Sequence, residues 1–210
     1  TSWGGGEEGW GIYIAGNYSK IYNNTIAYSD SYGIYVDNDM PSLPTFWNCI
    51  FGNTFIDNNK LIPHACQAYD SGINYWNSTV KLGYYNNTCG AACAHDNYIG
   101  NYWSDLACID ANNDGICDSS YNICGGTMKD YAPLVQPWAN YSRIKCGDVD
   151  CSGGVTTADV YPVFRRVFGD PVCSDWAADV DCSGGVTTAD VYPVFRRVFG
   201  DPVNCCTGCE

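Results

Sequence analysis

The sequence predicts a mainly β protein: a short right-handed parallel β-helix followed by a small α-helical module. Short runs rich in Ile, Val and Tyr alternate with Asn-rich turns over the first hundred residues. A segment of 25 residues then occurs twice without change, at 148–172 and 179–203. The composition shifts near residue 140. The predicted division is therefore a β-helical domain at 1–135, a linker at 136–145 and the helical module at 146–210.

Composition limits the partners and the compartment. The chain of 210 residues has a net charge of −13, which disfavours binding to a phosphate backbone and favours binding to cations. No nucleic-acid partner is expected. The 14 cysteines form an even number at high density, which predicts disulfides and an oxidising compartment. A cytosolic metalloprotein with reduced thiols is the disfavoured alternative, because only two His and one lone C-x-x-C, at 206–209, are present.

Glycosylation sequons support the same compartment. Asn-x-Ser/Thr occurs at Asn17, Asn23, Asn77, Asn86 and Asn140. Together with the cysteines these sequons predict an extracellular or cell-surface glycoprotein with glycans among its contacts. No run of 18 apolar residues is present, so no membrane span is expected. The abrupt start at Thr1 suggests a mature or trimmed product.

The first hundred residues contain a weak repeat. Gly-Ile-Tyr-Ile at 11–14 returns as Gly-Ile-Tyr-Val at 33–36, an offset of 22 residues. Very short strands that repeat every 20 or so residues are typical of a parallel β-helix. Equivalent Ile side chains would then stack in interior ladders, and Asn at the bends would satisfy backbone groups. An antiparallel β-sandwich with Asn-rich turns stays open as the alternative.

Residues 11–103 resemble the β-helix repeat family of surface and periplasmic proteins that includes the NosD-like proteins. Residues 97–135 are similar to the C-terminal tail of archaeal members, with Asn-Tyr-Trp-Ser-Asp at 101–105 and Asp-Tyr-Ala-Pro-Leu at 130–134. The resemblance implies an archaeal surface β-helix. Metal delivery by analogy with NosD is a weaker idea, because the sequence lacks a Met/His set for copper. The cysteines at 108, 117 and 124 and the small number of coils depart from the family.

A β-helix with few coils leaves an open end. Repeat architectures need polar caps, because their terminal strands expose unpaired edges. The tail at 97–135 is expected to cap the C-terminal end, whereas no capping helix precedes residue 11. Either the cap lies in a missing N-terminal part, or subunits stack end to end into a fibre, sheath or lattice.

The duplicated segment opens with a calcium-loop pattern. Oxygen ligands at loop positions 1, 3, 5, 7, 9 and 12, with Gly at position 6, have the spacing of an EF-hand-type loop, here with Asp at position 12. The first copy offers Asp148, Asp150, Ser152, the Gly154 carbonyl, Thr156 and Asp159. The second copy offers Asp179, Asp181, Ser183, the Gly185 carbonyl, Thr187 and Asp190. Two calcium ions are predicted; the alternative is a pair of acidic turns without metal.

A helix is predicted after each loop. The apolar residues recur at helical spacing in the first copy: Val160, Val163, Phe164, Val167 and Phe168. Gly169 followed by Pro171 is a stop signal. Pro162 and its counterpart Pro193 are expected within the first helical turn, where proline is tolerated.

Residues 146–203 resemble the type I dockerins, which consist of two calcium loop–helix units related by a near two-fold axis. The resemblance implies a cohesin-like domain as partner. The family's recognition positions correspond to Thr157, Ala158, Arg165, Arg166, Thr188, Ala189, Arg196 and Arg197. Because the copies are identical, either could dock. Cys151 and Cys182 depart from the family, and we expect them to form bridges that clamp the loops.

A third acidic loop lies in the first part of the chain. Asp110, Asn112, Asp114, the Ile116 carbonyl and Asp118 occupy positions 1, 3, 5, 7 and 9 of a calcium loop. Position 12 is Tyr121 and not an acid. A third calcium site is predicted here, with an Asx-rich turn as the alternative.

No catalytic set is recognisable. Polysaccharide lyases and hydrolases need paired carboxylates, or an acidic calcium cluster with a base, across a groove. The available side chains form no such motif: Asp37, Asp39, Asp57, Asp70, His64 and His95. Cys89 and Cys93 could bind a metal together with His95, but disulfides are the commoner use of such cysteines.

The predicted function is that of a non-enzymatic, calcium-loaded and disulfide-stapled extracellular structural protein. It would polymerise through its β-helix end and its dockerin-like module, with another copy of itself or a cohesin-like domain as partner. The alternative is a carbohydrate-active or carbohydrate-binding subunit tethered through its dockerin to a cohesin scaffold. Aromatic residues that could stack on sugars are Trp3, Trp10, Tyr75, Trp76, Tyr84 and Tyr85.

Overall fold

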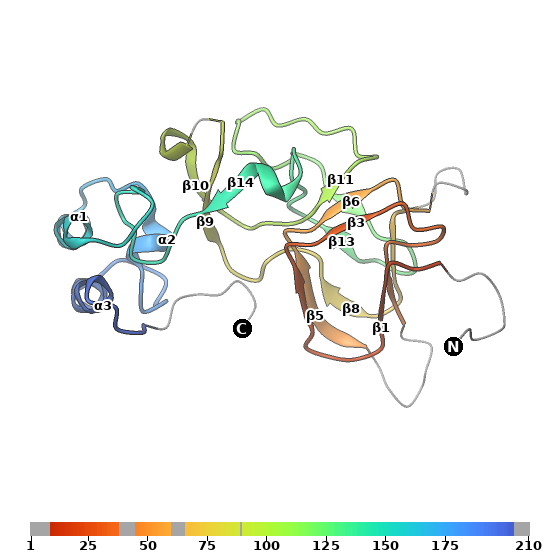
Figure 1. Ribbon diagram of the computed structural model, residues 1–210, viewed down its shortest axis with the longest axis horizontal. Helices are drawn as coiled ribbons and strands as arrows, with labels where there is room; N and C mark the ends of the chain where they lie inside the picture. The colour runs from red at the N-terminus through yellow and green to blue at the C-terminus, as the bar shows by residue number, and fades with distance from the viewer. Residues whose placement is uncertain (1–8, 38–44, 60–65, 89, 204–210) are drawn as a thin grey trace. The chain divides into compact units, whose positions relative to one another are not determined.

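The computed structural model describes residues 9–37, 45–59, 66–88 and 90–203. Within them lie 14 short strands, two 3-10 helices and three α-helices, so the prediction of a mainly β fold is confirmed (Figure 1). The chain divides into two units, one made of 1–78 with 99–138 and the other of 79–98 with 139–210.

Nine strands of the first unit form three parallel sheets. The first sheet joins β1 (Ile12–Ile14), β4 (Ile34–Val36) and β7 (Ala68–Asp70). The second joins β2 (Lys20–Tyr22), β5 (Phe46–Phe51) and β8 (Ile73–Tyr75). The third joins β3 (Thr25–Ala27), β6 (Thr54–Ile56) and β11 (Tyr102–Trp103). All their pairings are parallel, so the antiparallel sandwich is wrong for these strands.

The strand register follows the sequence repeat. Ile12 pairs with Ile34, which is the offset of 22 residues read from the sequence. Two further strands, β12 (Tyr121–Asn122) and β13 (Lys129–Asp130), form a short antiparallel pair. Strands this short provide few ladder hydrogen bonds, so the bends between them need other partners for their backbone groups.

The core of the first unit is a stack of apolar and aromatic side chains. Its fully buried members include Ile34, Ile50, Phe55, Trp76 and Trp103. The Trp103 ring lies between Phe55 and Tyr121, with ring centroids 4.2 and 4.0 Å away. Trp76 is fully buried, so it is not available to stack on a sugar.

An asparagine ladder runs through the bends of this unit. Asn24 Nδ2 donates to Asn53 Oδ1, and Asn53 Nδ2 donates to Asn101 Oδ1; both donor–acceptor distances are 3.0 Å. Asn101 Nδ2 donates to Asp130 Oδ2 and to two buried carbonyls, those of Ile50 and Trp76. Each ladder oxygen also accepts the backbone N–H of the preceding member. The ladder thus satisfies bend amides that no strand partner reaches.

Two shorter ladders follow the same rule. Asn48 donates to Asn74, and Asn74 donates to Asp70. In the other, Asn58 donates to Gln67, and Gln67 donates to Asp105.

Every ladder ends on a carboxylate that an aromatic side chain also contacts. Asp70 accepts from Trp76 Nε1, Asp130 from Trp103 Nε1 and Asp105 from the Tyr121 hydroxyl. Asp70, which the sequence left as a free carboxylate, is therefore a buried structural acceptor.

The second unit combines a small sheet with three helices. Strand β9 (Leu82–Asn86) pairs antiparallel with both β10 (Ala94–Asn97) and β14 (Tyr141–Arg143). The helices are α1 (Thr157–Val167), α2 (Asp175–Ala178) and α3 (Thr188–Val198), and the 3-10 helices among the described residues are η1 (Gly90–Cys93) and η2 (Trp138–Asn140).

The division of the chain into these two units differs from the expected boundaries 1–135, 136–145 and 146–210. The reason is that β14, in the expected linker, pairs with a strand from the first part of the chain.

The repeated helices α1 and α3 start on identical caps. Thr156 and Thr187 accept from the second helical amide, and Asp159 and Asp190 complete a capping box. Pro162 was expected in the first turn, but it is the sixth helical residue, because the helix already begins at Thr157. It therefore has no N–H to donate to the carbonyl four residues earlier.

Only part of the apolar stripe predicted for each helix is buried in the structure. Val163 and Val194 are fully buried in the core between the repeats. Phe164 and Phe168 are 46% and 73% exposed instead of buried, because the helix buries only one narrow stripe against its copy. Tyr161 is 64% exposed, and the second helix repeats this pattern.

Disulfides confirm the predicted oxidised state. Cys66 bonds with Cys124, Cys108 with Cys117, and Cys151 with Cys173. The other cysteines in the described ranges are also disulfide-bonded: Cys49, Cys93, Cys146 and Cys182. Such bonding indicates an extracellular or periplasmic compartment. Among the described residues, no helix has the length and apolar character needed to cross a bilayer.

Breaking the long ladder should destabilise the first unit. Asn101→Ala removes the donor to the Ile50 and Trp76 carbonyls and the acceptor for Asn53, leaving several buried groups unpaired. We expect a loss of about 2–5 kcal/mol in unfolding free energy, measured by urea denaturation. Asn24→Ala, at the exposed end of the same ladder, is the control and should cost about 1 kcal/mol or less. Equal losses would contradict the ladder's role.

Asp130 should make stability depend on pH. Burial raises the pKa of Asp130 to about 7, although hydrogen bonds from Trp103, Asn101 and Ala132 act to lower it. The folded chain then holds this proton more tightly than the unfolded chain, so the contribution of Asp130 to stability is highest below about pH 4 and is lost as pH rises through about 7. Urea unfolding between pH 4 and 8 should show a steeper fall for the natural chain than for Asp130→Asn, at about 1.4 kcal/mol per unit of pKa shift at most. Parallel curves would contradict it.

Candidate metal sites

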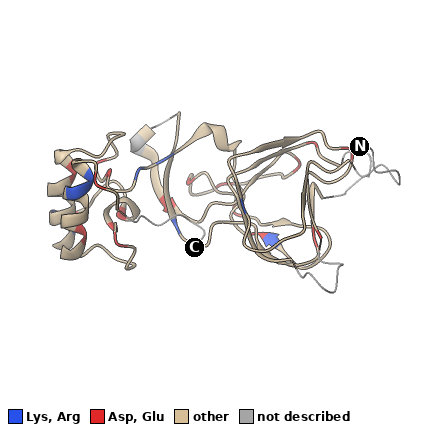
Figure 2. Ribbon diagram, turned by 60° about the horizontal axis from the view of Figure 1, so that its bottom comes forward, with Lys and Arg blue, Asp and Glu red and all other residues tan. Residues whose placement is uncertain are grey.

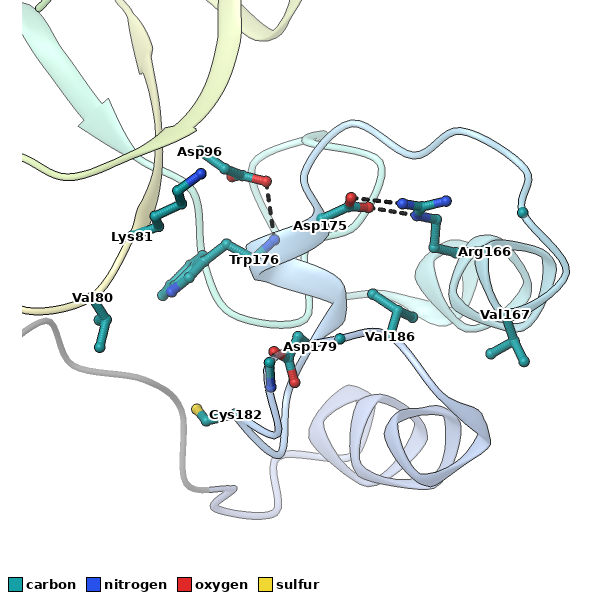
Figure 3. A pocket seen from close by; sticks show the side chains of 13 residues that line it. Val80, Lys81, Asp96, Arg166, Val167, Asp175, Trp176, Asp179, Cys182 and Val186 are labelled. Atoms are coloured by element: carbon teal, nitrogen blue, oxygen red, sulfur yellow. Dashed lines mark hydrogen bonds and ion pairs between the residues drawn. The ribbon is translucent and has the colours of Figure 1, made fainter.

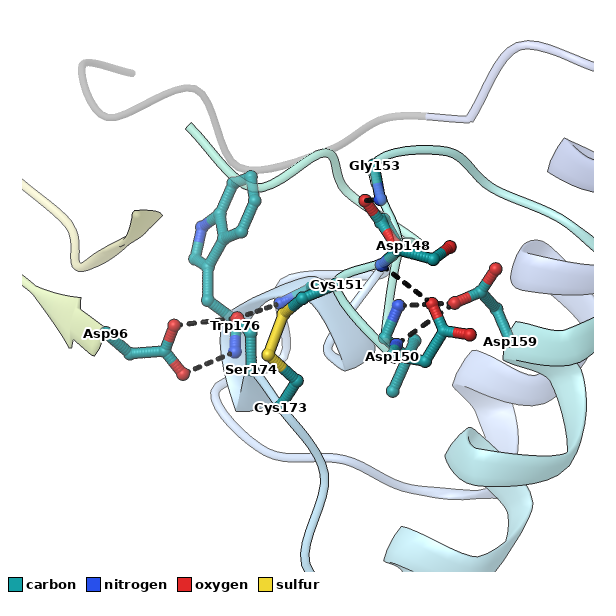
Figure 4. Close-up of a disulfide and its surroundings, with 12 residues drawn as sticks. Asp96, Asp148, Asp150, Cys151, Gly153, Asp159, Cys173, Ser174 and Trp176 are labelled. Carbon is teal, nitrogen blue, oxygen red and sulfur yellow. Dashed lines mark hydrogen bonds between the residues drawn. A yellow bond between two sulfur atoms is a disulfide. The ribbon is translucent and has the colours of Figure 1, made fainter. Parts of the chain in front are cut away.

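The first copy of the repeated loop gathers three carboxylates. Asp148, Asp150 and Asp159 each place one oxygen within 4.8 Å of the others (Figure 4). Asp148 Oδ2 accepts the Gly153 amide at 3.0 Å, and Gly153 has φ +99°, a region that glycine enters without strain. This closing bond holds the loop around the cluster.

Asp159 ties the loop to the helix. Its Oδ1 accepts the amides of Val149 and Asp150, and its Oδ2 accepts the Thr156 amide at 2.8 Å. The side chain is fully buried. The residue predicted at ligand position 12 therefore also organises the loop backbone.

Asp148 is the member of the first cluster whose hydrogen bonding is incomplete. It is 2% exposed, and its Oδ1 is buried without a hydrogen-bond partner. Burial raises the pKa of Asp148, as do the nearby charges of Asp159 and Asp150, whereas the amides of Gly153 and Ser152 lower it. A buried anionic oxygen without a partner is costly, and a cation would satisfy it.

The second copy repeats the cluster in more open surroundings. Asp179, Asp181 and Asp190 meet the same 4.8 Å criterion. Asp179 is half-buried, and its Oδ1 and Oδ2 accept the amides of Ser183 and Gly184 at 3.0 and 2.9 Å. Asp190 is fully buried and accepts the amides of Asp181 and Thr187. The structure thus brings together the three acidic positions of both ligand sets predicted in the repeat.

The neutral positions lie in the same loops. Ser152 and Ser183 hydroxyls donate to the Gly154 and Gly185 carbonyls at 3.4 and 3.2 Å. The Thr156 and Thr187 hydroxyls accept from the Ala158 and Ala189 amides as helix caps. In this arrangement the neutral ligands of both sets are engaged with their own loop, and binding an ion would require them to change partners.

A cavity of about 750 Å³ lies beside the second loop within the second unit (Figure 3). Asp179, Cys182, Gly184 and Gly185 form one wall. The other walls come from the segment just before β9 and from β10, α1 and α2: Val80, Lys81, Asp96, Arg166, Val167, Asp175 and Trp176.

Asp96 is a residue that the sequence did not indicate. It accepts the Ser174 hydroxyl at 2.7 Å and the Trp176 amide at 3.1 Å, which joins β10 to the start of α2. The two partners lie 78 and 80 residues away, and no local pattern links them.

The third predicted loop folds as a hydrogen-bonded turn. Asp110 accepts the amides of Asp114 and Gly115, Asp114 accepts the Ile116 amide, and Asp118 accepts the Ala111 amide. Asn112 donates to Asp114 at 3.0 Å. Among the described residues, the carboxylates of Asp110, Asp114 and Asp118 do not gather within 4.8 Å of one another, as those of the two repeated loops do. A calcium ion at this loop stays a prediction.

The predicted recognition positions lie on the helix surface. Thr157, Ala158, Thr188 and Ala189 are exposed at the helix starts. Arg165 pairs with Asp170, and Arg196 pairs with Asp201 at 2.9 Å.

The two copies diverge at the following arginine. Arg166 donates twice to Asp175, at 2.6 and 2.7 Å. The residue 31 positions after Asp175 is Cys206, so the repeat offers Arg197 no equivalent acid.

All five sequon asparagines lie in the described ranges, and none is buried. Asn17, Asn23 and Asn140 are exposed, and Asn77 and Asn86 are half-buried. Glycan attachment stays a prediction. Trp3, Asp39, His64 and Cys89 lie outside the described residues. Cys93 is disulfide-bonded, so it is not a thiolate ligand, and Tyr84 is too deeply buried to contact a sugar.

One family model matches part of the chain. The model described as "Periplasmic copper-binding protein (NosD)" matches residues 6–108, slightly less than half of the sequence. This confirms the NosD-like resemblance for the repeat region. No match was found among curated proteins or among solved structures.

Copper does not fit the described residues. Copper sites use imidazole and soft sulfur ligands, whereas carboxylate and carbonyl oxygens suit hard cations. His95 packs against the Tyr84 ring, Met128 packs against the core, and the cysteines of the described ranges are disulfide-bonded. The oxygen-only clusters in the second unit therefore favour a hard cation over copper.

Substitutions of Asp159 and Asp150 should distinguish a structural role in the loop from a role in metal binding alone. Asp159→Ala removes the acceptor of three loop amides, so it should lower the stability of the second unit by about 2–4 kcal/mol even in chelator. Asp150→Ala removes an exposed side chain that accepts one amide, so it should cost less than about 1 kcal/mol in chelator. Thermal unfolding in EGTA measures both; equal effects would show that Asp159 has no separate structural role.

Proposed function

We propose that the chain is a non-enzymatic, extracellular structural protein whose C-terminal module binds calcium and makes intermolecular contacts. The three parallel sheets of the first unit are interpreted as faces of a short right-handed β-helix. The second unit is interpreted as a dockerin-like module of two loop–helix repeats, extended by the sheet β10–β9–β14.

The observation that carries this proposal is the unpartnered Asp148 Oδ1. It lies in a loop where two further carboxylates approach within 4.8 Å. Oxygen donors at alternating positions around a glycine turn suit Ca²⁺, which takes six to eight oxygen ligands. Magnesium holds its water more tightly and is rarely enclosed by protein oxygens alone. Calcium is therefore the favoured ion.

The exposed helix faces support a docking role. Phe164 and Phe168, like Phe195 and Phe199, stand exposed side by side with ring centroids about 5 Å apart. Large apolar side chains gathered on a surface mark interaction sites. Each of these helices has its one acidic residue in the first turn and its two arginines in the last turn; Figure 2 colours the charged positions. The favoured partner is a second copy of the chain, with a cohesin-like domain as the other candidate.

A carbohydrate-binding subunit is the second candidate. Exposed aromatic residues on the sheet β2–β5–β8 favour it: Tyr22, Trp47 and Tyr75 are 56%, 45% and 41% exposed. By contrast, the rings of Trp10, Tyr35 and Tyr69 stack on one another at 4.5 and 4.6 Å, which leaves mainly ring edges for a ligand.

Calcium titration and a size measurement test the proposal. Calorimetry on the chelator-stripped oxidised chain should show at least two bound ions, and light scattering should show growth beyond the monomer in calcium. Phe164→Ser with Phe195→Ser should reduce assembly without changing the number of ions, because both side chains are exposed. A chain that binds no calcium, or stays monomeric in calcium at high concentration, would refute it. Monomers that bind polysaccharide would favour the second candidate.

A further inference from the structure

The two repeated loops have the same sequence but different surroundings. Residues 148–159 and 179–190 match letter for letter, so they offer identical donor atoms. Any difference between the sites must come from what packs against each loop. The structure shows such a difference at the first and fourth loop positions.

The first loop is covered. The Cys151 side chain, at the fourth loop position, is 7% exposed and packs with Ile144 and Ala177. Gly147, just before the loop, donates its amide to the Ala177 carbonyl at 2.8 Å. These contacts hold Asp148 out of water while its Oδ1 lacks a partner.

The second loop is open. Cys182, the counterpart of Cys151, is exposed, and Asp179 lines the cavity with Gly184 and Gly185. Asp179 already has an amide on each carboxylate oxygen. Without metal, this carboxylate is hydrated or hydrogen-bonded, so an ion must compete with existing partners.

We infer that the two loops bind calcium unequally: 148–159 is a tight site and 179–190 is a weaker, exchangeable one. This inference rests on the proposed calcium function. A buried carboxylate oxygen without a partner raises the free energy of the metal-free first loop. An ion that contacts this oxygen removes the unfavourable term, so it binds more tightly. The second loop carries no such penalty. Affinity at the first loop should be roughly tenfold to a hundredfold higher.

One neighbour acts against this order. Lys145 Nζ donates to the Gly153 carbonyl at 2.6 Å, which places a positive charge near the first loop. Lys145 is exposed, so salt screens its repulsion of an ion. Lys145→Gln should therefore tighten only the first site, and most at low salt.

A matched pair of variants tests the inference. Asp150→Asn and Asp181→Asn remove one ligand charge from each loop, at equivalent and exposed positions. Calcium titration of the full oxidised chain, by calorimetry with competing chelators, should resolve a tight and a weak step. Asp150→Asn should weaken the tight step at least about tenfold. Asp181→Asn should affect only the weak step.

The outcomes distinguish a failure of the unequal-affinity inference from a failure of the proposed calcium function. Two equal steps, or loss of the tight step in Asp181→Asn, would overturn the inequality while leaving calcium binding intact. No calcium uptake by the natural chain would overturn the proposed function itself. Thermal unfolding gives an independent reading: low calcium should raise the unfolding temperature of Asp181→Asn but not of Asp150→Asn. An identical rise in both variants would contradict unequal sites.

Discussion

Both units depend on one constraint: a chain of very short strands and loops must satisfy its bend amides with side-chain oxygens. Strands of two to six residues leave most backbone N–H groups outside regular ladders. In the first unit, Asn53 and Asn101 each accept one of these amides and donate a hydrogen bond to the next member of the ladder. In the second, Asp148 and Asp159 accept loop amides in the same way. Asn and Asp are therefore abundant here for their acceptors, before any ligand is considered.

The Asn and Asp acceptors differ in charge, and this difference decides which of them need a further partner. An Asn amide both donates and accepts, so ladder members satisfy one another and need nothing else. A carboxylate only accepts, so several together repel unless donors or a cation surround them. Asp130 resolves this with Trp103, Asn101 and Ala132 as donors. The loop at 148–159 brings three carboxylates together with too few donors, and the unpartnered Asp148 oxygen is the result.

The sequence predicted some local features of the fold, whereas it could not predict the long-range pairings. The 22-residue offset predicted the pairing of Ile12 with Ile34, and the loop spacing predicted which acids would meet. The pairing of β9 with β14 joins segments more than 50 residues apart, so the domain boundaries could not be read locally. The partnership of Asp96 with Ser174 is missed for the same reason. Hydrophobic periodicity also misplaced Phe164, because spacing identifies an apolar stripe but not whether another element covers it.

Identical sequence does not give identical sites, because affinity depends on the metal-free state as well as on the donors. The repeat supplies the same oxygens twice, yet Ile144 and Ala177 pack near the first loop and a cavity borders the second. If the loops bind calcium as proposed, a tight site and a weak site would have different roles: the ion at the first loop would stabilise the fold, and the ion at the second would exchange with the surrounding calcium. Helix α3 begins at the end of the second loop, on Thr187 and Asp190, and carries the exposed Phe195 and Phe199 towards its other end, so it connects the proposed weaker site to one of the two exposed aromatic faces. On this proposal, the calcium concentration would act on the second loop and its helix while the first loop stays occupied, so a duplicated sequence would give two unequal halves.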